Sequence, residues 1–322
     1  MTGATDVDLD AHYGTVTRAI AEGRVVPLLG AGVNLCDRPE KTAWEQGRYL
    51  PNGAELAAYL GKIFYYPDPQ EWNLLRVSQY VVAKEGLGPL YDELRELLDA
   101  NYPPTKVHDF FASLPATLRA LGDPAPQLIV TTNYDDALER AFDAVGEAYD
   151  VIWYIADRDP RGKFWHRPPG AEPRIIERPK AYDGLDIEHR TVILKIHGAV
   201  DRGDSERDSY VITEDHYIEY LTQTEIGKLI PAELLVKLKR SRFLFLGYSM
   251  QDWNLRVILH RIWGQQPLSY RSWAIQKNPN EIEQELWKAR GVEVLDIPLA
   301  DYMAELSKQI ANLPKSAAAV TT

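Results

Sequence analysis

The sequence predicts an α/β protein with a Rossmann-like three-layer fold, in which helices cover both faces of a central, mainly parallel sheet. Apolar segments of strand length alternate along the chain with segments whose apolar residues recur every three or four positions. Several strand-length segments are apolar throughout, as is typical of parallel strands that are covered on both faces. With 322 residues, 45% of them hydrophobic and 26% charged, the chain is long enough to bury one large core.

Seven segments are expected to form the strands of this sheet. They begin at residues 25, 127, 150, 191, 242, 272 and 292 and read, in that order, VVPLLG, QLIVTTN, DVIWYI, TVILKIHG, RFLFLGYS, SWAIQ and VEVLDI. Between the first two strands, segments 54–64 and 90–98 have helical periodicity. Their apolar stripes, expected to lie in the core, are Leu56, Tyr59, Leu60 and Ile63 in the first segment and Leu90, Leu94, Leu97 and Leu98 in the second.

The segment 156–190 interrupts this alternation, because it is rich in proline, glycine and charge. We expect it to be an inserted flap or small lobe, either a lid over a site or an interface with a partner. The expected organisation is an N-terminal segment over 1–20, one catalytic domain over 21–313 and a flexible tail over 314–322. Four aromatic residues near the insertion either stack on a nucleotide ring or pack the lobe onto the core: Trp153, Tyr154, Phe164 and Trp165.

Charge and cysteine content exclude several classes of function. The formal net charge of −11 and a pI of about 5.2 argue against a broad electrostatic surface for nucleic acid or anionic membrane. The single cysteine, Cys36, excludes an intrachain disulfide and any zinc site with two or more cysteine ligands, so no metal is expected. The first residues contain neither a basic nor an apolar targeting region, and no apolar run reaches 18 residues. We therefore expect a cytoplasmic protein.

Small and polar residues follow four of the predicted strands. In a parallel α/β sheet the carboxyl ends of the strands meet at one edge, where ligands bind. We therefore expect these residues to surround one pocket. They are Gly30, Ala31, Gly32 and Val33 after the first strand, Thr131, Thr132, Asn133 and Asp135 after the second, His197 and Gly198 after the fourth, and Gly247 and Ser249 after the fifth.

Each of these residues also has a purely structural interpretation. The glycines allow a tight turn, or a close approach of backbone amides to a pyrophosphate, although Leu35 stands where a dinucleotide fingerprint has its third glycine. Asn133 and Asp135 are typical caps for a helix that begins near Asp136, and Ser249 for the helix after the fifth strand. His197 fits a core histidine as well as a catalyst.

Taken together, the four motifs GAGVN, TTNYD, KIHG and LGYS resemble the nucleotide-site motifs of the sirtuin fold. The resemblance is closest to the bacterial sirtuin-like domains known as NAD hydrolases in anti-phage defence, and it extends from Val25 to the last helix. It implies that NAD⁺ is the substrate. The implied catalytic residues are His197, Asn133 and Asp135, and the implied NAD-binding residues are Gly30, Ala31, Gly32, Val33, Thr132, Gly247 and Ser249. Asp252 and Asn254, in the helix after the fifth strand, are further candidates that either contact the adenosine ribose or cap that helix.

The chemistry of NAD⁺ cleavage agrees with these residue types. Nicotinamide leaves as a neutral molecule and needs no general acid, whereas positive charge develops on the ribose in an oxocarbenium-like transition state. Asn133 can hold a water or a ribose hydroxyl, and Asp135 can order that network and favour the positive charge. His197, with an expected pKa near neutrality, can accept a proton from a ribose hydroxyl or from water.

Departures from the sirtuin deacylases favour water as the acceptor. Those enzymes carry a four-cysteine zinc module, which this chain with its one cysteine cannot form. Their Pro-Asp-Phe-Arg segment is replaced by LCDRPEKTAW, in which Arg38 is a candidate phosphate contact. The expected products are nicotinamide and ADP-ribose. Two alternatives remain open: a protein deacylase or ADP-ribosyltransferase, and a regulatory module that binds NAD⁺ or ADP-ribose without turnover.

A toxic NAD hydrolase has to stay inactive until it is triggered. A chain of this length has little room for a sensor, so we expect regulation by assembly, with itself as a homo-oligomer or with a ring-forming ATPase or another defence partner. Exposed tyrosine and tryptophan on an acidic chain suit such interfaces.

Overall fold

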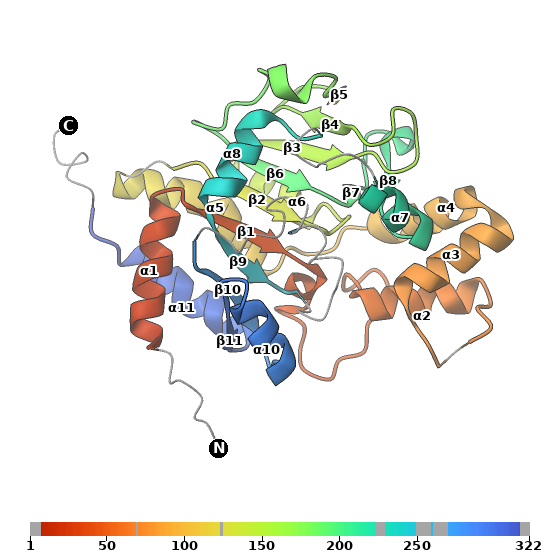
Figure 1. The fold of residues 1–322 in the computed structure, drawn as a ribbon, viewed down its shortest axis with the longest axis horizontal. Coiled ribbons are helices and arrows are strands. Elements are labelled where there is room, and N and C mark those ends of the chain that lie inside the picture. Colours follow the sequence, from red (N-terminus) through yellow and green to blue (C-terminus); the bar gives the residue numbers. More distant parts are fainter. Residues whose placement is uncertain are drawn as a thin grey trace.

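The computed structural model describes residues 8–68, 70–122, 125–222, 229–248, 259 and 270–315. Its centre is a nine-stranded sheet with the order β11-β10-β9-β1-β2-β6-β3-β4-β5 (Figure 1). The strands are β1 (Val25–Leu29), β2 (Leu128–Thr131), β3 (Tyr149–Tyr154), β4 (Phe164–Arg167), β5 (Arg174–Ile175), β6 (Thr191–Lys195), β9 (Arg242–Leu246), β10 (Ser272–Gln276) and β11 (Val292–Asp296). A two-stranded sheet pairs β7 (Gly198–Ala199) with β8 (Ser209–Tyr210).

The sheet is parallel from β11 to β3, and only the pairs β3–β4 and β4–β5 are antiparallel. All seven predicted strands are present, and the predicted three-layer α/β class is confirmed. The described helices are α1 (Leu9–Ala21), α2 (Gly53–Ile63), α3 (Leu74–Glu85), α4 (Leu87–Leu98), α5 (Lys106–Leu121), α6 (Ala137–Val145), α7 (Glu214–Thr222), α8 (Ala232–Arg240), α10 (Glu281–Lys288) and α11 (Leu299–Ala311).

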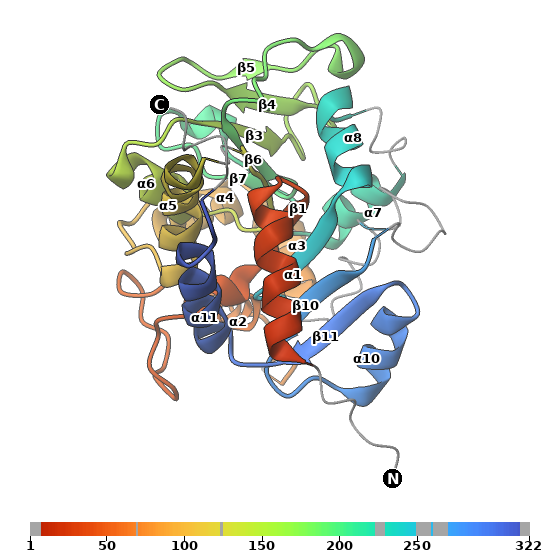
Figure 2. The same cartoon turned by 90° about the vertical axis from the view of Figure 1, so that its left-hand side faces the viewer.

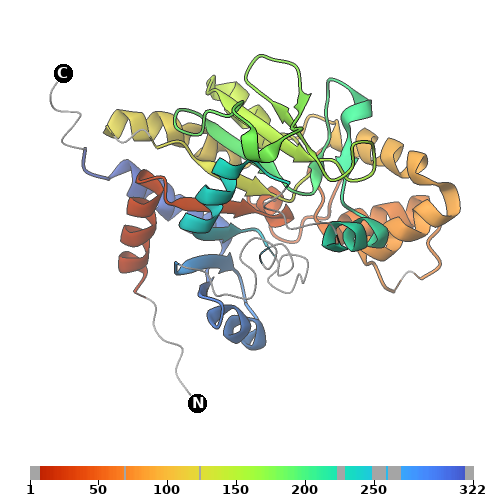
Figure 3. The same ribbon diagram turned by 45° about the horizontal axis from the view of Figure 1, so that its top comes forward.

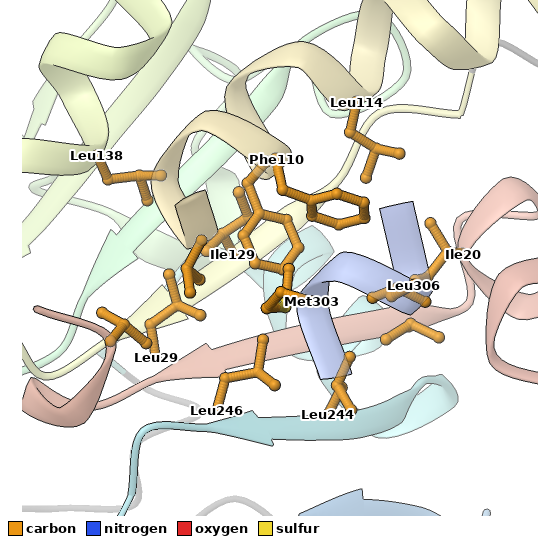
Figure 4. Packing of buried hydrophobic residues seen from close by; sticks show 14 of the residues in the cluster. Ile20, Leu29, Phe110, Leu114, Ile129, Leu138, Leu244, Leu246, Met303 and Leu306 are labelled. Carbon is orange, nitrogen blue, oxygen red and sulfur yellow. The ribbon is translucent and has the colours of Figure 1, made fainter. Parts of the chain in front are cut away.

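Helices cover both faces of the sheet because its central strands are apolar on both sides. In β1, Val25 and Leu29 belong to one core cluster, whereas Val26 and Leu28 belong to another. The first cluster lies under α1, α5, α6 and α11, and the second under α7, α8 and α10. Figure 2 shows these two groups of helices on opposite sides of the sheet. In Figure 4, Phe110 of α5 and Met303 of α11 meet strand residues of the first cluster.

A third group, α2, α3 and α4, lies at one end of the sheet (Figures 1 and 3). Its own core contains the predicted stripe residues Leu56, Leu60, Leu90 and Leu94. Ile63, expected in the core, is instead 38% exposed, because α2 ends at this residue. The long connection between β1 and β2 thus builds a helical wall beside the carboxyl ends of the strands.

The segment 156–190 extends the sheet beyond β3 through β4 and β5. Trp153, Tyr154 and Phe164 are buried, so these aromatic residues pack the segment onto the core. The contact is reinforced by buried His166, whose Nε2 lies 2.8 Å from Asp150 Oδ1 and whose Nδ1 lies 2.6 Å from the Tyr182 hydroxyl. Within the described ranges, no helix combines the length and apolar character that a bilayer span requires.

Candidate functional site

A cavity of about 690 Å³ opens at the carboxyl ends of β9, β1, β2 and β6. β1 pairs with β2 on one edge and with β9 on its other edge, so the strand order reverses at β1. Ligands of parallel α/β sheets bind at such a point. The volume lies in the range of small-molecule and cofactor sites. Its lining includes the glycine turn after β1, the turn after β2, His197, the start of α2, and Gly247 with Tyr248. Most of the predicted site residues therefore lie around one cavity.

The glycines after β1 are required by a contact between two backbones. The amide of Gly30 donates to the carbonyl of Leu246 at 3.0 Å, and that of Gly32 to the carbonyl of Gly247 at 2.9 Å. A Cβ atom on Gly32 would lie 2.7 Å from that carbonyl oxygen, and one on Gly247, with φ of +69°, would lie 2.3 Å from the amide of Val33. The motifs GAGVN and LGYS thus pack directly on each other.

This contact limits which amides can bind a pyrophosphate. The residues Ala31–Leu35 form a short 3₁₀ helix. The amide of Gly32 is bonded to Gly247, and the amide of Val33 donates to the carbonyl of Gly30 at 3.1 Å. The side chain of Val33 is fully buried. Gly32 therefore lines the cavity, Val33 lies in the core, and the amide hydrogens of both are already used inside the chain.

The turn after β2 holds Asn133 beside the glycine turn. The backbone amide of Asn133 is not free to bind a ligand, because it donates to Thr131 Oγ1 at 3.0 Å. The side-chain Nδ2 of Asn133 donates to the carbonyl of Gly30 at 3.4 Å. Thr132 is fixed on both sides: its amide donates to Leu29 and its hydroxyl accepts a 2.8 Å hydrogen bond from Tyr248. Asn133 is half-buried and lines the cavity.

Asp135 both accepts a hydrogen bond from the start of a helix and contacts a residue of the cavity wall. Its Oδ1 accepts a 3.1 Å hydrogen bond from the amide of Ala137, the first residue of α6, as a helix cap would. Its Oδ2 accepts a hydrogen bond of the same length from Asn34 Nδ2. Asn34 is itself buried at the cavity wall, and its Oδ1 has no partner among the described residues. Asp135 thus orients an acceptor that sequence reasoning missed.

His197 is a buried, neutral imidazole on the cavity wall. Only 4% of the residue is exposed, Nδ1 lies 3.4 Å from the Tyr217 hydroxyl, and Nε2 has no partner within the described part of the chain. Burial lowers the pKa of His197 to about 3. The expected pKa near neutrality is therefore wrong, because α7 and its tyrosines shield the ring from water. A neutral ring nevertheless keeps a lone pair that can accept a proton.

Lys195 is a second residue that the sequence interpretation missed. It is 1% exposed, and its Nζ lies 2.7 Å from Oε1 of the buried Glu139 and also donates to the carbonyl of Asp135. The sequence does contain a sign of this ion pair, because a lysine inside the apolar run TVILKIHG is expected to be buried, and a buried ammonium requires a partner.

The start of α2 was also missed as part of the cavity wall. Asn52 and Glu55 form a capping box there, and Asn52 and Gly53 line the cavity. Arg38, the candidate phosphate contact, donates from Nη2 to Glu55 Oε1 at 2.6 Å, and its Nη1 is buried without a partner among the described residues. The guanidinium of Arg38 is therefore paired with Glu55, in the first turn of α2. Three predicted residues, Ser249, Asp252 and Asn254, lie outside the described residues.

The sequence matches a known protein family over most of the strands that carry the site. The family model described as SIR2-like domain matches residues 127–295, just over half of the chain. The chain belongs to the SIR2-like family. The matched range contains the TTNYD, KIHG and LGYS motifs, so the sirtuin-like resemblance expected from them is confirmed.

Two curated relatives are bacterial proteins named for NAD⁺ hydrolysis and for defence. NAD(+) hydrolase ThsA of Acinetobacter baumannii (strain 532279) is 29% identical over 195 residues, which cover 60% of this chain and 32% of that protein. Defense-associated sirtuin 2 of Bacillus subtilis is 22% identical over 291 residues, which cover 87% of this chain and 24% of that protein. The SIR2-like chain thus spans a third or less of the length of these relatives.

A solved structure with a related name is a mutant Sir2 with a p53 peptide and NAD. It is 13% identical, with a TM-score of 0.35, over 92% of this chain and 98% of that one. At that TM-score the likeness is too weak to bear on the fold or on the function of this SIR2-like chain.

Proposed function

We propose that this SIR2-like domain hydrolyses NAD⁺ at the bond between nicotinamide and ribose, releasing nicotinamide and ADP-ribose. The observation that carries the proposal is the pair of buried atoms in the cavity wall, His197 Nε2 and Asn34 Oδ1, which have no partner among the described residues. Buried polar atoms are normally hydrogen-bonded, so a polar ligand is the expected partner. The name of one curated relative, NAD(+) hydrolase ThsA, supports NAD⁺ as that ligand.

In this proposal, the side chains act on the ribose rather than on the leaving group. Water attacks the anomeric carbon, the glycosidic bond breaks, and its electron pair moves to the pyridine nitrogen, so nicotinamide leaves uncharged. His197 accepts the proton lost by the attacking water. Asn133 holds that water or a ribose hydroxyl, and the carboxylate of Asp135 favours the developing positive charge.

We further propose that the reaction serves as the NAD-depleting effector of an anti-phage defence system, controlled by self-assembly or by a partner such as a ring-forming ATPase. The name of one curated relative, Defense-associated sirtuin 2, supports the role in defence. Control by self-assembly is tested by measuring the oligomeric state of the purified protein by light scattering over a range of protein concentrations, with NAD⁺ turnover per chain measured at each concentration. Equal turnover per chain at every concentration would contradict control by self-assembly.

The test of the activity is product analysis by chromatography. The purified protein is incubated with NAD⁺ alone, with an acetylated peptide, and with its genomic neighbour. Nicotinamide and ADP-ribose in equal amounts without peptide are the expected result. Product that requires the peptide would indicate a deacylase or ADP-ribosyltransferase. Tight binding with no turnover in all three incubations would indicate a regulatory module and contradict the hydrolase.

A further inference from the structure

Lys195 occupies an unusual place between the two turns of the site. It is the last residue of β6, two positions before His197, and its side chain crosses to the start of α6. There its Nζ donates to the carbonyl of Asp135 and pairs with Glu139 Oε1 at 2.7 Å. The side chains of Lys195 and Glu139 are 1% and 6% exposed. One ammonium therefore links the end of β6, two residues before His197, to the turn that carries Asp135.

We propose that Lys195 is a positioning residue, which holds the 133–135 turn at a fixed place relative to His197, with Glu139 as the counter-charge that makes its burial possible. This inference rests on the proposed NAD⁺ hydrolysis. Nζ contacts backbone and a carboxylate inside the fold, so the residue acts through the turn rather than on the substrate.

The ammonium of Lys195 has two functions with different energetic consequences: it pairs with the charge of Glu139, and it donates a hydrogen bond to the carbonyl of Asp135. A buried ion pair can often be replaced by an apolar pair of similar volume without loss of stability, whereas removal of one partner leaves an uncompensated charge. The bond from Nζ to the carbonyl of Asp135 has no such replacement, because an apolar side chain cannot donate. Stability should therefore follow the pairing of charges, and activity should follow the donor.

Three variants separate these functions. Lys195→Met/Glu139→Leu removes both charges and the donor at nearly constant volume. Glu139→Gln leaves the lysine and its donor in place but removes the counter-charge. Lys237→Met is the matched control, because Lys237 Nζ donates at 2.9 Å to the carbonyl of Pro126, just before the opposite end of β2. Each variant is compared with the full chain by thermal unfolding and by NAD⁺ kinetics.

We expect stability and activity to rank in opposite orders. The double variant should unfold within a few degrees of the unmodified chain, yet lose at least tenfold in kcat/KM, mainly through kcat, because the turn is misplaced. Glu139→Gln should unfold at a lower temperature and keep kcat/KM within threefold. Lys237→Met should keep kcat/KM unchanged. A double variant that retains activity or loses its fold overturns the proposal, and so does a Glu139→Gln variant as inactive as the double one.

Amide hydrogen exchange separates this inference from the proposed function. In the double variant, exchange at residues 133–137 should increase while the amides of β1 and β2 stay protected. If the unmodified chain releases no nicotinamide, the hydrolase proposal fails, and exchange still reports whether Lys195 holds the turn. Unchanged exchange at residues 133–137 overturns the positioning role, whatever the activity.

Discussion

The side-chain amide of Asn34 donates a 3.1 Å hydrogen bond to Oδ2 of Asp135, joining motifs that stand 101 residues apart. Both side chains are buried. The amide of Thr132, in the same turn as Asp135, also donates to the carbonyl of Leu29 at the end of β1. The turns after β1 and β2 therefore form one unit, which fixes the free oxygen of Asn34 at the cavity wall.

Replacement of Asn34 by alanine should impair both stability and NAD⁺ cleavage. Asp135 would lose a donor inside the fold, which costs about 1–3 kcal/mol in the free energy of unfolding, and the cavity would lose the Oδ1 acceptor. We expect at least a tenfold lower initial rate of nicotinamide release, measured alongside urea unfolding. Asn101→Ala, at an exposed asparagine that accepts a hydrogen bond from Arg202, is the control. Equal rates for the two variants would contradict the role of Asn34.

Stability should decrease on mild acidification because buried histidines resist protonation. Burial lowers the pKa of His12 and His108 to about 4 and that of His197 to about 3, whereas an unfolded histidine titrates near 6.5. Above pH 6.5 neither state gains a proton. Below it the unfolded state does, so each histidine lowers the free energy of unfolding by up to about 1.4 kcal/mol per pH unit.

The measurement is urea unfolding at pH 7.5 and pH 5.5 for the unmodified chain and for His197→Gln. The variant lacks one of the groups that bind protons only when unfolded, so its stability should fall less between the two pH values. Identical pH dependence in the two proteins would show that His197 does not have a lowered pKa.

NAD⁺ cleavage should show no loss of rate near pH 6.5. Because burial lowers the pKa of His197 to about 3, its imidazole is already neutral throughout the range from pH 6 to pH 8. We expect kcat/KM to vary less than about twofold over that range, measured by nicotinamide release at constant ionic strength. A decrease below pH 7 that disappears in His197→Gln would assign an ordinary pKa to this residue.

Substitution of Gly247 should disrupt the contact beneath the cavity. A Cβ atom there would lie 2.3 Å from the amide of Val33 in a residue with φ of +69°, so Gly247→Ala should cost about 2 kcal/mol or more in the free energy of unfolding. Gly14→Ala is the control, because its Cβ would meet open space within α1 and should stabilise the helix by about 0.5–1 kcal/mol. Equal melting temperatures for the two variants would contradict this account of the motif.

The sequence predicted the parts of the fold that depend on local pattern. Apolar runs identified all seven parallel strands, and small residues at their ends indicated the edge where the cavity lies. The short strands β4 and β5 were not predicted, because they form only by pairing with the edge of β3. The glycine turn was interpreted as a tight turn or a pyrophosphate contact, and the sequence could not reveal that it also packs on Gly247, more than two hundred residues away.

Features that depend on distant neighbours could not be predicted from the sequence. The pKa of His197 follows from its burial beside Tyr217, and the acceptor of Asn34 is oriented by Asp135. Lys195 gave a usable signal, since a lysine within an apolar strand implies a buried counter-charge, but only the structure identifies Glu139 as that partner.

The most direct test of the account compares nicotinamide release by the unmodified chain, His197→Ala, Asn133→Ala and the exposed control His189→Ala. All four are assayed with NAD⁺ at equal concentrations of protein that thermal unfolding shows to be folded. We expect ADP-ribose and nicotinamide from the unmodified chain and from His189→Ala, and at least a hundredfold less of both from His197→Ala and Asn133→Ala. Undiminished release by folded His197→Ala would contradict the account.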